Sequence, residues 1–205
     1  MSDTSVVAIV LAAGASTRMG SPKSTLQWKG RAFVDHCVVL ARECATTIVV
    51  DGATPLTTHQ FARSVLLQHN PQWSNGPLSS LQRGLERALF EAPRLSGVLV
   101  LTVDRPHVNA ATVTALLEAH SRSPYAFVQP VHSDTSGHPV VWPRAAIDHL
   151  LKLPATDSPR SLLSTKLAPK RARIPVDDPA VLDNIDRPMA YQALLQRDHE
   201  ALSDL

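Results

Sequence analysis

Aromatic residues make up only 4% of the chain, and its two cysteines are Cys37 and Cys44. The shortage of aromatic rings argues against a surface that stacks nucleic-acid bases. The cysteines form no Cys-x-x-Cys pair, which argues against a metal site built on sulfur. We expect both to be buried, reduced thiols within a helix. The sequence therefore predicts no nucleic-acid partner and no cysteine-based metal centre.

The chain also lacks a charge excess and a long apolar run. Its formal net charge is +2, and its nearest approach to a basic run, Lys170-Arg-Ala-Arg173, is expected to be the solvated edge of a strand or loop. No apolar run approaches about 18 residues, and no cationic and then apolar leader begins the chain. We therefore expect a cytoplasmic protein with no membrane partner.

Apolar content is plentiful, because 44% of the 205 residues are hydrophobic, which is enough for one substantial core. We expect a single domain over residues 1–205. Several of the 16 prolines fall between residues 153 and 183. They predict a loop-rich region there, too short to have a core of its own.

Apolar runs alternate along the chain with segments of helical periodicity. The expected strands are Val6–Leu11, Thr47–Val50, Val98–Leu101, Ala126–Gln129 and Val140–Trp142. The expected helices are Phe33–Glu43, Leu78–Phe90, Ala110–His120, Arg144–Lys152 and Met189–Arg197. This alternation predicts a three-layer, Rossmann-like α/β fold, in which a mostly parallel sheet has helices on both faces. In such sheets ligands bind beyond the carboxyl ends of the strands.

A segment rich in small residues follows the first expected strand and reads Leu11-Ala-Ala-Gly-Ala-Ser-Thr-Arg-Met-Gly-Ser-Pro-Lys23. Small side chains let main-chain N–H groups approach phosphate oxygens, and Arg18 and Lys23 supply positive charge. The spacing between Gly14 and Gly20 does not fit a Walker loop, and two glycines are too few for the dinucleotide fingerprint. The segment is therefore expected to be a third kind of triphosphate loop.

This loop resembles the signature loop of the nucleotidyltransferases that activate sugars, polyols and molybdopterin. It is most similar to that of the molybdenum cofactor cytidylyltransferases and their guanylyltransferase relatives. Further similarities follow in the family's order over nearly the whole chain: Asn70-Pro71, Gly76-Pro-Leu-Ser-Ser80, Val103-Asp-Arg-Pro106, Gly137-His-Pro139 and Asn184-Ile-Asp-Arg-Pro188. The resemblance implies the nucleotidyltransferase form of the predicted fold. It also implies transfer of CMP from CTP to molybdopterin cofactor, with release of pyrophosphate.

Two aspartates are the metal ligands that the resemblance implies, and Mg²⁺ is the expected ion because it binds few protein carboxylates and keeps several waters. Asp104 ends the expected strand that begins at Val98 and stands in the family's Asp-x-Pro pattern. Asp186 stands where the family shows Asp-Ile-Asp-Thr-Pro, with Asn184 in place of the first acidic residue. The alternative for each aspartate is a helix cap.

Nucleotide binding is expected mainly from the signature loop. Arg18 and Lys23 would hold the phosphates and act with Asp104 as catalytic residues. The full set expected to bind nucleotide is Leu11, Ala12, Ala13, Gly14, Ser16, Arg18, Lys23, Asn70, Gly76, Ser79 and Ser80. Ala12-Ala13 and Ser79-Ser80 resemble the cytidylyl enzymes, whereas Gly76-Pro77-Leu78 resembles the guanylyl enzymes. CTP is therefore preferred to GTP.

The acceptor is expected to contact Arg105 and His138, although Arg105 replaces the family's usual Met or Gln. Asp157-Ser-Pro-Arg160 lacks the glycines of the corresponding family stretch, so a sugar phosphate or polyol phosphate stays open as the acceptor. A molybdoenzyme could receive the product. From another class, the chain could be a module that binds nucleotide or molybdopterin without transferring anything.

Overall fold

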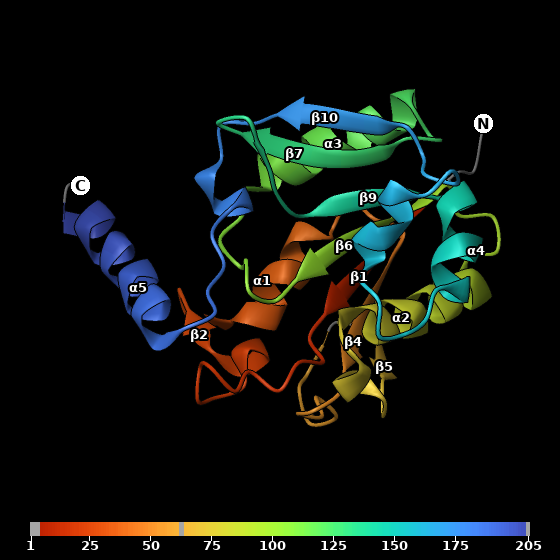
Figure 1. Cartoon of the computed structure of the whole chain (residues 1–205). Coiled ribbons are helices and arrows are strands. Elements are labelled where there is room, and N and C mark those ends of the chain that lie inside the picture. Colours follow the sequence, from red (N-terminus) through yellow and green to blue (C-terminus); the bar gives the residue numbers. More distant parts are fainter. Residues whose placement is uncertain (1–4, 62–63, 204–205) are drawn as a thin grey trace.

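A central sheet of eight strands organises the computed structural model, which describes residues 5–61 and 64–203 (Figure 1). Its strands are β1 (Val6–Leu11), β4 (Thr46–Asp51), β5 (Val65–His69), β6 (Gly97–Thr102), β7 (Phe127–His132), β8 (Thr135–Ser136), β9 (Val140–Pro143) and β10 (Arg171–Pro175). The strand order is β10-β7-β9-β6-β1-β4-β5, with β8 paired to β7 outside this path. A separate hairpin joins β2 (Gln27–Trp28) to β3 (Arg31–Ala32).

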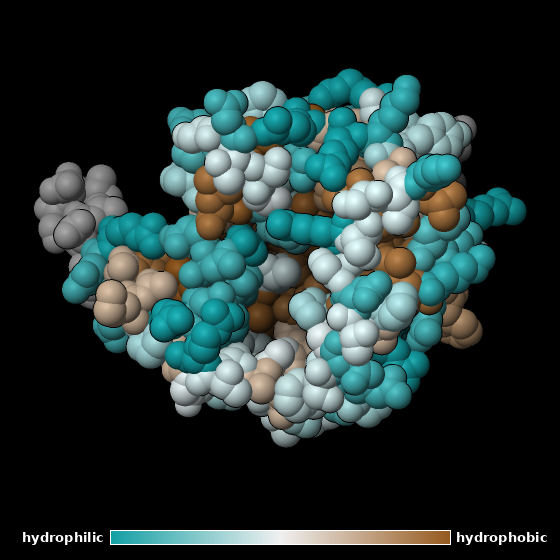
Figure 2. Space-filling view, viewed as in Figure 1, coloured by the Kyte–Doolittle hydropathy of each residue, from teal (hydrophilic) through white to brown (hydrophobic). Residues whose placement is uncertain are grey.

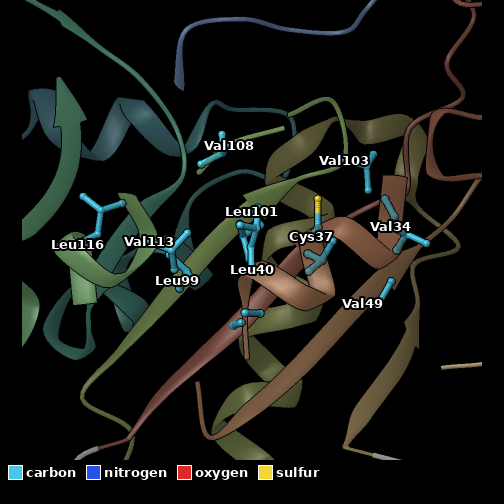
Figure 3. Packing of buried hydrophobic residues seen from close by; sticks show 14 of the residues in the cluster. Val34, Cys37, Leu40, Val49, Leu99, Leu101, Val103, Val108, Val113 and Leu116 are labelled. Carbon is cyan, nitrogen blue, oxygen red and sulfur yellow. The ribbon is translucent and has the colours of Figure 1, made fainter. Parts of the chain in front are cut away.

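Helices cover both faces of the sheet, which confirms the expected three-layer α/β fold. They are α1 (Phe33–Leu40), α2 (Pro77–Glu91), α3 (Ala110–Arg122) and α4 (Arg144–Lys152). The last helix, α5 (Pro188–Ser203), lies to one side of the sheet and packs through Leu194 against Met19 and Phe33. The alternation of side chains along β1 divides the core in two, because Val7 and Ile9 pack with α2 and α4 while Ala8 and Val10 pack with α1 and α3. Figure 3 shows the second of these clusters, with Cys37 and Leu40 of α1 beside Leu99 and Leu101 of β6.

Strand direction places the candidate site. β1 pairs in parallel with both β4 and β6, so the carboxyl ends of these three strands meet at one edge of the sheet. β9 is antiparallel to β6 and to β7, and therefore brings its amino end to that same edge. The loops after Leu11 and Thr102 and the loop before Val140 thus lie close to one another.

The sequence prediction missed several strands. β5 and β10 are edge strands with half-buried or exposed side chains, so neither has the continuous apolar run of a central strand. β10 lies inside the expected loop-rich region of residues 153–183 and pairs with β7 through Arg171–Pro175. This pairing agrees with the expected strand edge at residues 170–173.

Helix boundaries also differ from the prediction, most of all at α1 and α5. The expected helix over Phe33–Glu43 ends at Leu40, and the last helix begins at Pro188 and continues to Ser203. Cys44 therefore lies beyond α1 and is only half-buried, whereas Cys37 is fully buried within it; both are free thiols. Burial raises the pKa of both thiols, that of Cys44 to about 12 with a further contribution from Glu43, so both stay protonated near neutral pH.

A helix able to cross a lipid bilayer would need a long, uniformly apolar stretch. Within residues 5–61 and 64–203, no helix has that length and apolarity.

Candidate active site

The signature loop is anchored at its start and closes on itself. The Ala12 N–H donates to the carbonyl of Val50 at 2.9 Å, and the Ala53 N–H donates to that of Ala13 at 3.0 Å, so the end of β4 supports the loop. Ser16 adopts a positive φ of 55°, and its hydroxyl accepts the Lys23 N–H at 3.0 Å. This contact brings the end of the signature loop back toward its start, so that Lys23 and Gly14 line the same recess.

The two expected metal ligands come to the same place from distant parts of the chain. The Ile185 N–H donates to the carbonyl of Asp104 at 2.8 Å, which joins the loop before α5 to the end of β6. Asp186 lies next to that contact, and its Oδ1 is 2.6 Å from the Nζ of Lys23. Its Oδ2 is 3.5 Å from a guanidinium nitrogen of Arg18. The structure therefore brings together the four charged residues that the signature motifs predicted.

A small recess separates the loop from Asp104. It has a volume of about 140 Å³ and is lined by Gly14, Ser16 and Lys23 on one side and by Thr102 and Asp104 on the other. The hydroxyl of Thr102 donates to the carboxylate of Asp104. The Nη1 of Arg105 also donates to Oδ1 of this carboxylate, at 3.4 Å. An anion held by the loop would thus lie beside a carboxylate that is already oriented.

The charges around Asp186 favour its ionised form. Partial burial alone would raise its pKa, but the hydrogen bond and charge of Lys23, with the charges of Arg18 and Arg105, outweigh that and hold the pKa below its ordinary value. Asp186 is therefore a carboxylate across the physiological range. In the protein without ligands it neutralises the two loop cations.

The donor set fits a hard divalent cation. Magnesium is commonly held by one or two carboxylates, with substrate phosphates and waters as the other ligands. Asp104 and Asp186 supply two such carboxylates beside the phosphate recess. Among the described residues no group of three or more His, Cys, Asp or Glu side chains has the arrangement of a complete metal cage. The residues thus suit an ion that substrate phosphates help to hold.

A second recess, with a volume of about 290 Å³, lies between the signature loop and the start of α2. The side formed by the signature loop contains Ala13 and Gly14, and the opposite side contains Trp73, Gly76 and Ser80. Its volume and its wall of small residues suit a nucleoside. Trp73 was not among the expected residues, although it is one of only three tryptophans in an aromatic-poor chain.

Asn70 and Ser79 are expected nucleotide ligands that lie beneath this recess and not on its wall. The side-chain amide of Asn70 donates to the hydroxyls of Ser79 and Ser80, each at 3.0 Å, and its oxygen accepts the Gln72 N–H. The Ser79 hydroxyl lies 2.8 Å from the carbonyl of Gly76, to which it donates. These contacts hold the start of α2 in place, so both residues act on the recess through the backbone.

A third cavity, also of about 290 Å³, opens beside Asp104 toward β9. Arg105 and His138 line it, as do Leu11 and Thr102 at the ends of β1 and β6. Figure 2 shows this face of the molecule hollowed near its middle, with hydrophobic atoms on the floor and hydrophilic residues around the rim. The structure thus places both expected acceptor residues next to the phosphate recess.

Packing beneath this cavity fixes the position of His138. A Cβ on Gly137 would lie 2.3 Å from the carbonyl oxygen of Val181, and that same carbonyl accepts the His138 N–H at 3.0 Å. Burial lowers the pKa of His138 to about 4, and the nearby Arg105 and Arg160 contribute to this shift. The imidazole is therefore neutral near pH 7. Arg160 also lines the cavity and was not among the expected site residues.

Comparison with models of known protein families shows which family the chain belongs to. The model of the MobA-like NTP transferase domain matches residues 8–172. The chain belongs to this family. The matched span contains the signature loop, Asp104 and the lining of the third cavity up to Arg160, whereas Asp186 lies beyond it.

The name of a curated relative of this MobA-like chain is consistent with the family assignment. It is 33% identical over 126 residues to a probable molybdenum cofactor guanylyltransferase of Bacillus cereus strain B4264, a match that covers 60% of each chain. The chain thus spans about 60% of the length of this curated relative.

Solved structures show the same fold. The Rv0371c protein of Mycobacterium tuberculosis H37Rv is 23% identical, with a TM-score of 0.78 over 96% of this chain and 100% of that one. Its complex with manganese gives a TM-score of 0.73 at 22% identity, over 94% of this chain and 99% of that one.

Proposed function

We propose that this MobA-like chain transfers a nucleoside monophosphate from a nucleoside triphosphate to the phosphate of a molybdopterin cofactor, releasing pyrophosphate. The observation that carries the proposal is the contact between Ile185 and Asp104, which sets two carboxylates beside the loop cations Arg18 and Lys23. The residues that line the third cavity come from segments spread along the chain, the first being Leu11 and the last Asn184. For that reason we also propose that residues 1–205 act as one domain.

The chain's own residues would act by positioning and by neutralising charge. Both reactants are anions, so the reaction needs cations where the phosphates meet. Lys23 would leave Asp186 to bind the phosphates of the departing pyrophosphate, and Arg18 would bind phosphate oxygens from the loop. The acceptor phosphate is already ionised at neutral pH. The site therefore needs no covalent nucleophile and no general base.

Asp104 and Asp186 would hold the divalent cation. When bound, such an ion neutralises charge on the phosphates during transfer. The manganese in a structural neighbour supports a divalent ion in general, and we propose magnesium because two carboxylates are its usual protein ligands. Removing divalent ions with a chelator should stop pyrophosphate release, and adding back Mg²⁺ or Mn²⁺ should identify the better ion.

We propose GTP as the nucleotide, with CTP as the alternative. The names of the relatives favour guanylyl transfer, whereas the sequence comparison preferred CTP on the strength of Ala12-Ala13 and Ser79-Ser80. Ser79 lies beneath the recess in contact with Asn70 and Gly76 and is not among the residues that line it. One of the two features that favoured CTP is thereby weakened.

The test is a pyrophosphate-release assay with each of the four nucleoside triphosphates, a divalent ion and molybdenum-loaded molybdopterin. We expect release with GTP and a dinucleotide product of matching mass. Lys23→Gln should lower the rate by about 100-fold, whereas Lys166→Gln, at an exposed position away from the site, should not. Nucleotide binding without pyrophosphate release would instead support the non-catalytic module.

A polyol or sugar phosphate is the second candidate acceptor. The missing glycines around Asp157 and the unusual Arg105 favour it over a typical molybdopterin site. The same assay with such acceptors in place of molybdopterin distinguishes the two, because the nucleotide side of the reaction would be identical.

A further inference from the structure

The third cavity is lined by positively charged side chains. Its lining includes two arginines, Arg105 from the end of β6 and Arg160 from the 3-10 helix Pro159–Ser164. Among the described residues no aspartate or glutamate lines it. A cavity with two cationic side chains and no lining carboxylate favours an anion.

Arg105 is held where an acceptor phosphate must arrive. Its Nη1 lies 3.2 Å from the Thr102 hydroxyl and 3.4 Å from Asp104 Oδ1, and its side chain is only 13% exposed. Within the described residues, the Nε of Arg105 and the Nδ1 of His138 are buried and have no hydrogen-bond partner. A buried polar group without a partner is costly, so these atoms are well placed to meet a ligand.

Arg160 lines the same cavity from a different element, the 3-10 helix Pro159–Ser164. Its side chain is exposed and forms no ion pair with any described residue. Its positive charge contributes to lowering the pKa of both Arg105 and His138. Unlike Arg105, it pairs with no carboxylate in the part of the chain that the structure describes, so its guanidinium is available to an incoming anion.

The floor of the cavity is apolar. Leu81, Val100, Phe127, Val140 and Trp142 line it, and the rings of Phe127 and Trp142 lie 4.4 Å apart between centroids. Such a floor suits a flat ring system better than a polyol, whose hydroxyls would lose their hydrogen bonds to water on entering.

We infer that Arg105 and Arg160 form a clamp for the acceptor's phosphate monoester, and that the apolar floor beside this clamp selects a phosphorylated ring over a polyol phosphate. The inference rests on the proposed function, since it assigns the acceptor side of that site. Guanidinium groups suit this role because they bind phosphate oxygens in pairs. The clamp would hold the phosphate next to Asp104, with the ring over Phe127 and Trp142.

The experiment measures binding of phenyl phosphate, glycerol 3-phosphate and phenol to the full chain by calorimetry. We expect phenyl phosphate to bind at least about 10-fold more tightly than glycerol 3-phosphate, and phenol not to bind measurably. Arg160→Gln should weaken phenyl phosphate by at least about 10-fold. Arg94→Gln, an exposed arginine elsewhere, removes the same charge and should leave binding unchanged.

Two results would overturn the clamp. One is equal binding of phenyl phosphate by Arg160→Gln and the unaltered chain, with thermal melting showing both folded. The other is a larger loss with Lys23→Gln than with Arg160→Gln, which would place the probe in the triphosphate loop.

The clamp and the proposed function can fail separately. Phenyl phosphate binding that depends on Arg160, without pyrophosphate release from any nucleotide, would reject the transferase and retain the clamp. In an active enzyme, Arg160→Gln should raise the KM for the acceptor at least about 10-fold and leave the KM for the nucleotide unchanged.

Discussion

The nucleotide side of the site and its acceptor side are supported in different ways. The signature loop is closed by contacts within itself, such as the Ser16 hydroxyl on the Lys23 N–H, and a Cβ on Gly14 would meet no atom within 4 Å. The acceptor side depends on segments far apart in the chain, and a Cβ on Gly137 would collide with Val181. Open space next to backbone N–H groups leaves room for phosphates, whereas tight packing fixes the side chains that we propose to select an acceptor.

Each side also has a buried carboxylate beneath it. On the nucleotide side, Asp51 accepts the Leu56 N–H at 2.6 Å and contacts His69 at 2.8 Å. On the acceptor side, Asp178 accepts the Asn109 N–H at 2.9 Å and the Thr112 hydroxyl at 2.7 Å at the start of α3. Asp178 also accepts the Ala180 N–H, which precedes the carbonyl of Val181 that holds His138. Loss of either carboxylate should therefore change stability as well as activity, and Asp178 accepts more of the hydrogen bonds.

The largest effect is expected at Asp104, where the two sides meet. Asp104→Ala should lower the rate of pyrophosphate release by at least about 100-fold, because the cation at the reacting phosphates would lose one of its ligands. Asp148→Ala removes an exposed carboxylate that pairs with Arg144 on α4 and serves as the control. Activity of the Asp104 variant within a few-fold of the unaltered chain would remove this residue from the mechanism.

Asp178→Ala should destabilise the fold by about 3 kcal/mol, because it leaves three donors without their acceptor in a buried place. Its neighbour Asp177 is exposed, so Asp177→Ala should change stability by no more than about 0.5 kcal/mol. Urea unfolding measures both. Equal stability of the two variants would show that the acceptor side does not depend on this carboxylate.

A pair of glycine substitutions tests the difference in packing directly. Gly137→Ala should cost about 2 kcal/mol, since the added carbon must displace the backbone at Val181. Gly14→Ala should leave the unfolding free energy within about 0.5 kcal/mol but weaken nucleotide binding, because the methyl group occupies space that phosphates need. Thermal melting and nucleotide titration separate these effects. The contrast between the two sides would be wrong if Gly14→Ala proved the less stable variant.

The smallest expected effect is a pH dependence from His138. Its folded pKa of about 4 lies below the ordinary value of 6.5, so between these values the unfolded chain binds the extra proton. Stability should therefore fall as pH decreases through this window, by about 1 kcal/mol between pH 7.5 and 5.5. His138→Gln should show a smaller loss over that range in denaturant titrations. An unchanged slope in the variant would assign the pH dependence to other groups.

The parts of the fold that could be predicted are those with a local signal. β1 has the continuous apolar run of a central strand and was placed with its observed bounds, as was α4. The signature loop could be found because its residues are consecutive. β5 and β10 gave no such signal, since β5 is only partly buried along its length and β10 alternates partly buried with exposed side chains.

The acceptor side was harder to predict because its parts meet only in three dimensions. Arg160 lies in a 3-10 helix that follows Pro159, and nothing near it in the chain marks it as facing Arg105. Trp73 had a weak signal, the scarcity of aromatic residues. Asn70 and Ser79 were found through the family's motifs, but only the structure shows that they bind each other beneath the recess. Which of the expected site residues touch a nucleotide stays a prediction.

The ion pair of Lys23 with Asp186 has a consequence for the order of events in the site. A triphosphate that draws Lys23 away frees a carboxylate for a divalent cation, and a cation at Asp186 frees Lys23 for a phosphate. Binding of either ligand would thus remove an interaction that competes with the other, so we expect each ligand to raise the affinity for the other by the same factor. Such a site would bind nucleotide and metal cooperatively. Without them, the charges of Lys23 and Asp186 compensate each other.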